Sequence, residues 1–220
     1  MVLKFYSVSY SAGGCGVVAM VLAELQIPYE LVPIDNSKNE NKTPEYLAMH
    51  PWGQVPLIDD DGFLLYESRA ICRYLVEKYG GQGPSLVPTD LKAKALFEQA
   101  ASIEFANFFP PVHKMCTQTI FNPYLKRPVD EAALEQGKLE FTEKLAVYEV
   151  ILGKQKYLAG NELTLADLFH LIFTPMLISW GKLDVMADRG PNVTRWWKDI
   201  TSRPTWIKLQ AEGITKSVGV

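Results

Sequence analysis

Short apolar runs alternate with a segment of helical periodicity at the start of the chain. The runs Val2–Ser7 and Tyr29–Ile34 predict two β-strands. Between them, from Cys15 to Leu25, apolar residues recur at the spacing of one helix face. A strand, a helix and a strand joined by short links favour a right-handed parallel pair.

The same alternation continues as a short helix after Pro44, a hairpin around the polar turn Asp59–Gly62, and a helix that opens at Ser68. Gly80 and Gly81 end this last helix, and further glycines and prolines follow as far as Pro88. We interpret the order of elements up to residue 80 as that of a thioredoxin-like α/β domain. Residues 81–89 are then a linker.

Beyond the linker the pattern is helical, without a convincing strand. The capping pair Thr89-Asp90 predicts a long helix to about Phe121, interrupted at Pro110-Pro111. The spacing Thr164…Asp167 predicts a capping box. The remaining predicted helices cover 130–152, 164–180, 192–201 and 204–212. Residues 90–220 are therefore predicted to form an all-α domain.

Composition and charge narrow the class of protein. The chain has 220 residues, a formal net charge of −3 and a pI near 5.7, with no Lys/Arg-rich run, so nucleic acid is not an expected partner. No apolar run is long enough to span a bilayer, and the N-terminus lacks a signal-peptide pattern. Three cysteines without a CxxC spacing argue against a disulfide framework and a zinc site. We expect a soluble, cytoplasmic protein without a membrane partner.

Two stretches carry the candidate chemistry. In Pro51–Pro56 the Val55-Pro56 pair precedes a strand, where a cis peptide is expected, and Val55 can present its N–H and C=O to an extended peptide. In Tyr66–Ala70 an acid and a hydroxyl precede a helix, whose N-terminus favours a carboxylate. Together the two stretches predict a site for a small zwitterionic peptide.

These stretches also carry a family resemblance. Gln54-Val55-Pro56 followed by Glu67-Ser68-Arg69-Ala70-Ile71 resembles the glutathione site of the glutathione transferases, and the run Lys42–Pro56 is similar to the phi class in particular. The resemblance covers nearly the whole chain. It implies glutathione as cosubstrate, no metal or tightly held cofactor, a homodimer, and an active site in the cleft between the two domains.

Ser11 matches the position of the phi-class catalytic serine. It stands in the loop ahead of the first helix, where a hydroxyl and a helix N-terminus can both favour a thiolate. An ordinary loop or N-cap serine is the alternative interpretation. Gly16 stands where the family often has arginine, and Tyr6, Ser7, Ser9 and Tyr10 are other nearby hydroxyls.

Cys15 is a second candidate nucleophile. A cysteine in the first turn of a helix can have a lowered pKa and perform redox chemistry. It has glycine and valine neighbours and no resolving partner, so we interpret it as a small buried residue. Cys72 and Cys116 lie on helical patterns and are interpreted as packing residues.

The resemblance also implies the remaining contacts to glutathione. Asn41 and Lys42 would contact the glycine carboxylate, with Lys42 supplying the cation; a solvated loop lysine is the alternative. Glu67 and Ser68 would hold the γ-glutamyl end, although Ser68 could simply cap the helix. The full set of predicted glutathione-binding residues is Asn41, Lys42, Gln54, Val55, Pro56, Glu67 and Ser68.

The electrophile site is predicted on the long helix of the second domain. His113, Thr117 and Phe121 are spaced i, i+4, i+8 and share one face. The resemblance places such residues in an apolar pocket, together with Tyr10 and Ala12. Ordinary helix packing is the alternative.

The resemblance implies that the protein conjugates glutathione to hydrophobic electrophiles, as in detoxification, with a possible glutathione peroxidase activity. Two alternatives are a non-catalytic carrier of hydrophobic small molecules (a ligandin) and a Cys15-dependent, glutaredoxin-like thiol transferase. A scaffold role is weakened because the sequence carries no appended module.

Overall fold

A computed structural model of the chain describes residues 2–81 and 83–215. By its contacts the chain divides into two compact units, one from residues 1–85 and 203–220 and the other from Leu86–Ser202. The helix at 204–212 therefore groups with the α/β unit, whereas the sequence analysis assigned it to the helical domain. The boundaries 1–80, 81–89 and 90–220 stay a prediction.

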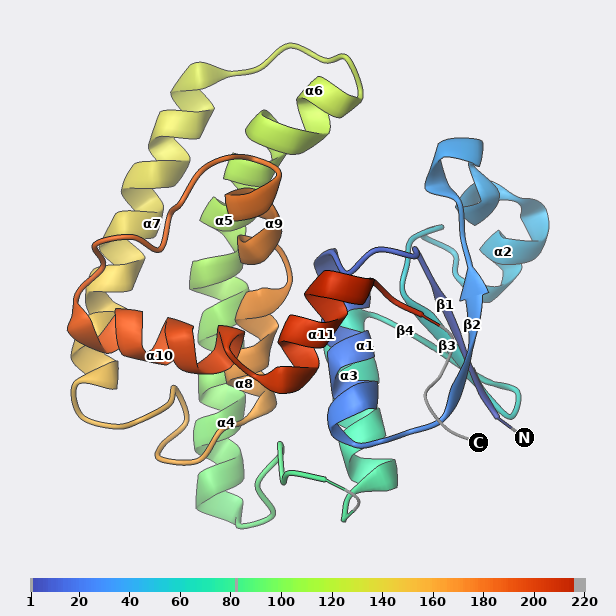
Figure 1. The fold of residues 1–220 in the computed structure, drawn as a ribbon, viewed down its shortest axis with the longest axis horizontal. Coiled ribbons are helices and arrows are strands. Elements are labelled where there is room, and N and C mark those ends of the chain that lie inside the picture. The colour runs from blue at the N-terminus through green and yellow to red at the C-terminus, as the bar shows by residue number, and fades with distance from the viewer. Residues whose placement is uncertain (1, 82, 216–220) are drawn as a thin grey trace. The chain divides into compact units, whose positions relative to one another are not determined.

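The first unit contains a four-stranded sheet in the order β2-β1-β3-β4 (Figure 1). The central strand β1 pairs in parallel with β2, Phe5 opposite Leu31, and antiparallel with β3, Phe5 opposite Ile58. The strands are β1 Leu3–Ser7, β2 Tyr29–Pro33, β3 Leu57–Asp60 and β4 Phe63–Tyr66. This topology confirms the predicted thioredoxin-like fold.

Three helices accompany this sheet, namely α1 Gly13–Glu24, α2 Pro44–Met49 and α3 Ser68–Tyr79. Helices α1 and α3 pack against each other and lie on one side of the sheet in Figure 1. Because side chains alternate along β1, Phe5 is fully buried while the ring of Tyr6 meets Tyr46 of α2 at 6.3 Å. Two 3₁₀ turns, Asn36–Lys38 and Glu40–Lys42, lead into α2.

Helix α11, Pro204–Glu212, joins this unit beside α1 (Figure 1). The Glu24 carboxylate, at the end of α1, accepts hydrogen bonds from Arg203 Nε at 2.8 Å and Nη2 at 2.6 Å, and a further one from the Thr205 hydroxyl. Trp206 and Leu209 are buried. A charge-assisted, bidentate pair thus fixes the start of α11 to α1.

The second unit is helical. Its helices α5 and α7 pack side by side (Figure 1). The Asp130 side chain caps α7 by accepting a hydrogen bond from the Ala133 N–H. The predicted helix 91–121 forms without a break, but its α-helical hydrogen bonding changes to π-helical at Glu104–Phe108 and at Thr117–Phe121, not at Pro110-Pro111 as predicted. Pro110-Pro111 falls in α5, directly after the first π turn. The first four helices are α4 Leu91–Ile103, α5 Phe109–Cys116, α6 Asn122–Tyr124 and α7 Glu131–Leu152.

One predicted helix is wrong in its extent. The apolar stretch 164–180 forms α8 Leu165–Leu168, a 3₁₀ turn Phe169–Leu171 and α9 Thr174–Ser179, not one helix. Pro175 lies in the first turn of α9, where its missing N–H costs nothing, whereas in a continuous helix that N–H would be required. Helix α10, Pro191–Thr201, follows as predicted.

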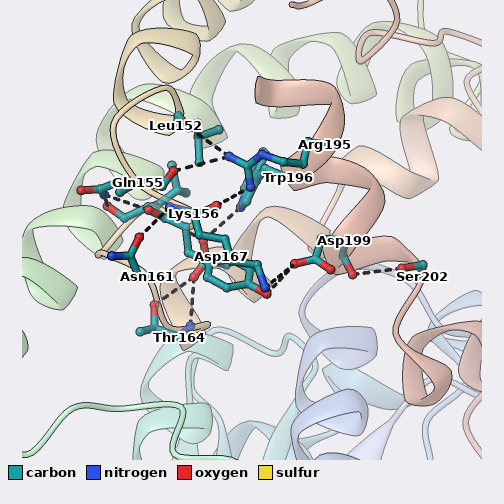
Figure 2. Close-up of polar contacts among 12 residues, drawn as sticks. Leu152, Gln155, Lys156, Asn161, Thr164, Asp167, Arg195, Trp196, Asp199 and Ser202 are labelled. Atoms are coloured by element: carbon teal, nitrogen blue, oxygen red, sulfur yellow. Dashed lines mark hydrogen bonds and ion pairs between the residues drawn. The ribbon is translucent and has the colours of Figure 1, made fainter. Parts of the chain in front are cut away.

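A buried carboxylate organises the centre of this unit. Asp167 of α8 completes the predicted capping box by accepting from the Thr164 N–H at 2.9 Å and its hydroxyl at 3.1 Å. It also accepts from the Leu158 N–H and from Trp196 Nε1 of α10, both at 3.0 Å. Figure 2 shows these contacts beside Arg195, which binds backbone carbonyls at the end of α7. Burial raises the pKa of Asp167, and these donors offset part of the cost of burying its carboxylate.

No helix within the described residues is long and apolar enough to cross a membrane. The same part of the chain contains no cluster of three His, Cys, Asp or Glu side chains that could hold a metal ion.

Candidate functional site

The loop before α1 places Ser11 at a helix N-terminus. Ala12 is the N-cap residue, with an extended backbone (φ −134°) and no side-chain cap, and Gly13 begins the helix with φ +56°. Among the described residues, no backbone bond uses the N–H groups of Gly13, Gly14 or Cys15. Ser11 is half-buried, and the N–H groups of Gly13 and Gly14 at the helix N-terminus are available to an anion.

Gly14 brings three separate segments together. A Cβ atom at Gly14 would lie 2.8 Å from both Cβ and Oγ of Ser68 and 3.2 Å from Cδ of Pro56. The first turn of α1, the loop before β3 and the first turn of α3 therefore meet with no room for a side chain. The predicted residues Pro56 and Ser68 are brought to the first turn of α1 by this contact, and Ser11 lies in the loop that precedes the same turn.

The loop before β3 has the predicted geometry. The Val55-Pro56 peptide is cis. The Gln54 carbonyl accepts a hydrogen bond from the Tyr46 hydroxyl at 2.7 Å, which fixes the loop to α2. Within the described chain, no backbone bond uses the N–H or C=O of Val55. Val55 can thus pair with an extended peptide, as β-strand addition requires.

Glu67 and Ser68 form the start of α3. Glu67 has φ +71°, a conformation unusual for a residue other than glycine, and its side chain is exposed. Neither it nor Ser68 caps the helix through a side chain. The Ser68 hydroxyl and the first N–H groups of α3 therefore remain available for a carboxylate.

Asn41 and Lys42 converge on the carbonyl oxygen of Gly53. Asn41 Nδ2 donates to it at 2.8 Å and Lys42 Nζ at 2.7 Å, and Lys42 also donates to the Trp52 carbonyl at 3.0 Å. Gly53 has φ +55°, and a Cβ there would meet the Asn41 carbonyl at 2.6 Å. The two predicted residues are thus fixed to the loop that leads to Val55, with an exposed cation at its edge.

Beneath this loop lies His50, a residue that the sequence analysis did not single out. It is buried and stacks on Tyr66 with ring centroids 4.3 Å apart. Its Nδ1 has no hydrogen-bond partner among the described residues. Burial lowers the pKa of His50, so the ring is neutral at pH 7.

Cys15 has the properties of a packing residue. Its side chain is buried, and burial raises the pKa of its thiol to about 11, against hydrogen bonds from Ser7 and Val8 that lower it. The thiol is therefore protonated at neutral pH and lacks the thiolate needed for disulfide exchange. Cys72 and Cys116 are also buried and free, as predicted.

In the second unit, part of the predicted electrophile site lines an open groove of about 680 Å³. His113 and Thr117 face this groove, whereas Phe121 does not line it and instead packs 6.0 Å from the His113 ring. The π turn at Thr117–Phe121 changes the spacing along the helix, which explains the difference. The groove is lined by Phe105, Ala106, Phe109, Pro110, His113, Lys114, Thr117 and Gln118.

Aromatic rings dominate this groove. Phe105 and Phe109 stack with centroids 5.8 Å apart, and Phe109 stacks on His113 at 5.4 Å. Burial lowers the pKa of His113, so it contributes a neutral ring at pH 7. Such a surface suits flat apolar molecules. Tyr10 and Ala12, also predicted for the electrophile, lie in the first unit next to Ser11, and Tyr10 is exposed.

One contact to Ser11 was not predictable from the sequence. Gln210 of α11 donates from Nε2 to Ser11 Oγ at 2.9 Å. The two residues are 199 positions apart and belong to no common motif. No local pattern could have identified this pair.

Known proteins resemble this chain over most of its length. Two family models match the chain: the N-terminal domain of glutathione S-transferase at residues 15–78 and the C-terminal domain of glutathione S-transferase at residues 112–204.

Individual relatives match nearly the whole chain. Glutathione S-transferase hmp2 of Hypomyces subiculosus is 40% identical over 216 residues, which covers 96% of this chain and 99% of the relative. Glutathione S-transferase F10 of Arabidopsis thaliana is 37% identical over 213 residues, covering 96% and 98%. The crystal structure of glutathione transferase F7 from Populus trichocarpa superposes with a TM-score of 0.89 at 34% identity, covering 97% of this chain and 100% of the other.

Proposed function

Since the chain belongs to the glutathione transferases, and to their phi class, which join the sulfur of glutathione to hydrophobic electrophiles, we propose that Ser11 stabilises the glutathione thiolate. The observation that carries this proposal is the contact of Gly14, in the first turn of α1, with Ser68 and Pro56, because Ser11 lies in the loop that leads directly into this turn. A peptide held by the latter two segments has its sulfur near the N-terminus of α1.

Each group has a distinct task in the proposed complex. Val55 pairs with the peptide backbone of glutathione, and Ser68 with the N-terminus of α3 binds its γ-glutamyl carboxylate. Glu67 balances the ammonium group. Lys42, supported by Asn41, faces the glycine carboxylate, and Gln54 and Pro56 shape the loop between them.

The reaction needs a thiolate at neutral pH. A free cysteine thiol has a pKa of about 8.5, so only a small fraction is ionised at pH 7. The Ser11 hydroxyl donates to sulfur, and the N–H groups of α1 add the positive end of the helix dipole, so the proton leaves to solvent. The sulfur lone pair then attacks the electrophilic carbon, and the leaving group departs with its bonding electrons.

We propose that the electrophile binds against aromatic and small side chains. In the second unit the proposed binding residues are His113 and Thr117, which line the groove, with Phe121 against the His113 ring. In the first unit they are Tyr10 and Ala12, next to Ser11. The stacked rings around His113 support this assignment because they offer a flat apolar surface.

The test is conjugation of glutathione to a chloronitrobenzene by the wild type, Ser11→Ala and Cys15→Ser. We expect Ser11→Ala to lose on the order of a hundredfold in turnover, since one donor to the reacting anion is removed. Cys15→Ser should keep its turnover. Loss confined to Cys15→Ser would overturn the assignment in favour of a thiol transferase. A wild-type protein that binds glutathione and a hydrophobic dye but does not conjugate glutathione would instead be a carrier of hydrophobic small molecules.

Glutathione peroxidase activity is a further proposal for the same thiolate. Sulfur attacks the terminal oxygen of an organic hydroperoxide, the O–O bond breaks, and the alcohol leaves after taking up a proton, which oxidises the thiolate to a sulfenic acid. The thiol of a second glutathione then displaces water from this sulfenic acid and forms the disulfide. An assay with cumene hydroperoxide tests this activity, and turnover that is the same in Ser11→Ala would exclude Ser11 from it.

Homodimer formation and a cytoplasmic location are also proposals, supported by the family alone. Sedimentation velocity of the purified protein tests the first: a species of monomer mass at micromolar concentration would contradict it. Cell fractionation tests the second, and a signal confined to an organelle fraction would contradict that location.

A further inference from the structure

The C-terminal helix of the first unit contacts the loop that carries the proposed thiolate-binding serine. Gln210 of α11 donates from Nε2 to Ser11 Oγ at 2.9 Å, and also to the Ser11 carbonyl at 3.3 Å. The side-chain oxygen of Ser11 is therefore a hydrogen-bond acceptor in the free protein. No bond within the described residues uses the Ser11 hydroxyl as a donor.

The hydroxyl proton is what the thiolate needs. A serine hydroxyl has one proton to donate and two lone pairs to accept with. When Gln210 donates to one lone pair of Ser11 Oγ, the Ser11 proton must point in another direction. The hydrogen bond that Ser11 accepts also polarises its O–H group and makes it a stronger donor. We propose that Gln210 is a positioning residue that directs the Ser11 proton toward the sulfur of glutathione. This inference rests on the proposed role of Ser11.

The rest of the C-terminal segment holds Gln210 in place. Below it, the pair between Glu24 and Arg203 fixes the start of α11 to α1. Above it, the Ile214 N–H donates to the Ser9 carbonyl at 2.8 Å. A Cβ at Gly213, which has φ +73°, would approach the same carbonyl to 2.8 Å. The C-terminal segment is therefore held on both sides of Gln210, by Glu24 at Arg203 and by the Ser9 carbonyl at Ile214.

The experiment measures the pKa of the glutathione thiol bound to the protein, from its ultraviolet thiolate absorbance, together with kcat and KM. Gln210→Leu removes the donor at similar size. We expect it to raise the thiol pKa and lower kcat about threefold, the effect of one neutral hydrogen bond. The KM for glutathione should not change, because Gln210 does not bind the peptide.

Gln210→Glu gives the sharper result. A carboxylate only accepts, so it takes the Ser11 proton away from sulfur. The pKa of the bound thiol should rise, and kcat should fall by roughly tenfold, more than in Gln210→Leu, because the competing bond is charge-assisted. Lys208→Gln, on the same helix but without a contact to Ser11, is the matched control and should behave as wild type.

A double-mutant cycle separates positioning from a general structural role. In a Ser11→Ala background, Gln210→Leu should leave kcat and the thiol pKa unchanged, because there is no hydroxyl to direct. Equal losses in both backgrounds would overturn the inference. If Ser11→Ala raises the thiol pKa but Gln210→Leu does not, this inference fails alone. If Ser11→Ala leaves the thiol pKa unchanged, the proposed function of Ser11 fails with it.

Discussion

Two glycines in the first turns of α1 contact different parts of the proposed glutathione site. Gly14 contacts Ser68 and Pro56, which belong to the proposed peptide site. Gly16 faces the Ser11 backbone instead, and a Cβ there would lie 3.2 Å from the Ser11 carbonyl carbon. Neither has a positive φ, so alanine fits the helix at both positions and only the new methyl group matters.

We predict different consequences for the two alanine substitutions. Gly14→Ala forces Ser68 and Pro56 apart, destabilises the protein by about 1–3 kcal/mol, and weakens glutathione binding. Gly16→Ala presses on Ser11 and should lower kcat with little change in the dissociation constant of glutathione. Isothermal titration and steady-state kinetics of both variants measure this split. Identical profiles would show that the two glycines do not affect binding and turnover separately.

At the scale of elements, capping signals were readable from the sequence while helix regularity was not. Asp90 and the Thr164…Asp167 box begin their helices as predicted, because capping depends on residues within one turn. The π turns at Glu104–Phe108 and Thr117–Phe121 carry no comparable local signal. The second π turn shifts Phe121 from the helix face of His113 and Thr117, to which the i, i+4, i+8 spacing assigned it.

In the candidate site, too, the features that depend on neighbouring residues were predictable and those that join distant segments were not. The cis Val55-Pro56 peptide and the free start of α3 follow from neighbouring residues and were predicted. The Gln210–Ser11 contact joins α11 to the loop before α1 and was not. Likewise, the grouping of α11 with α1 depends on the Glu24–Arg203 pair, which has no local sequence signature.

The pair that joins α1 and α11 makes a pH-dependent contribution to stability. Burial of Glu24 raises its pKa, but the hydrogen bonds from Arg203 and Thr205 outweigh burial and hold the pKa below its usual value of 4.5. A carboxyl whose pKa is lower in the folded state stabilises the protein fully above the unfolded pKa. That contribution is lost as pH falls through the folded pKa.

Glu24→Gln should therefore reduce the free energy of unfolding by about 1.5–3 kcal/mol at pH 7, the cost of losing a charge-assisted bond. The difference from wild type should shrink once the pH falls below the usual pKa of 4.5. Urea unfolding at a series of pH values measures it. Glu30→Gln, at an exposed position of β2, is the control and should show no such trend. A difference that grows toward low pH would contradict the assignment.

At the scale of the whole molecule, two arginines join segments that are distant in sequence, each within a different unit. Arg203 binds Glu24 in the first unit. Arg195 binds the carbonyls of Lys156 and Leu152 at 2.9 and 3.0 Å in the second unit, at the end of α7. Because each unit has its own contacts, the loss of either arginine should be felt within one unit only.

Hydrogen exchange followed by mass spectrometry tests this division. Arg203→Ala should speed exchange in α1 and α11 by roughly tenfold, because a local opening loses one strong contact, and should leave α7 unchanged. Arg195→Ala should give the reverse pattern, with faster exchange at the end of α7. Faster exchange across both units in either variant would show that they open together.

The grouping of α11 with the first unit has a consequence for how the protein is made. A ribosome delivers the strands of the sheet first, then all of Leu86–Ser202, and only afterwards the helix that carries Gln210. The helical unit can therefore fold while its neighbour still lacks a structural element. The serine loop is synthesised near the beginning, yet it obtains its last contacts near the end. A nascent chain released after Ser202 would have complete sheet strands but would lack Gln210, so the hydrogen bond to Ser11 forms only when translation has passed α11.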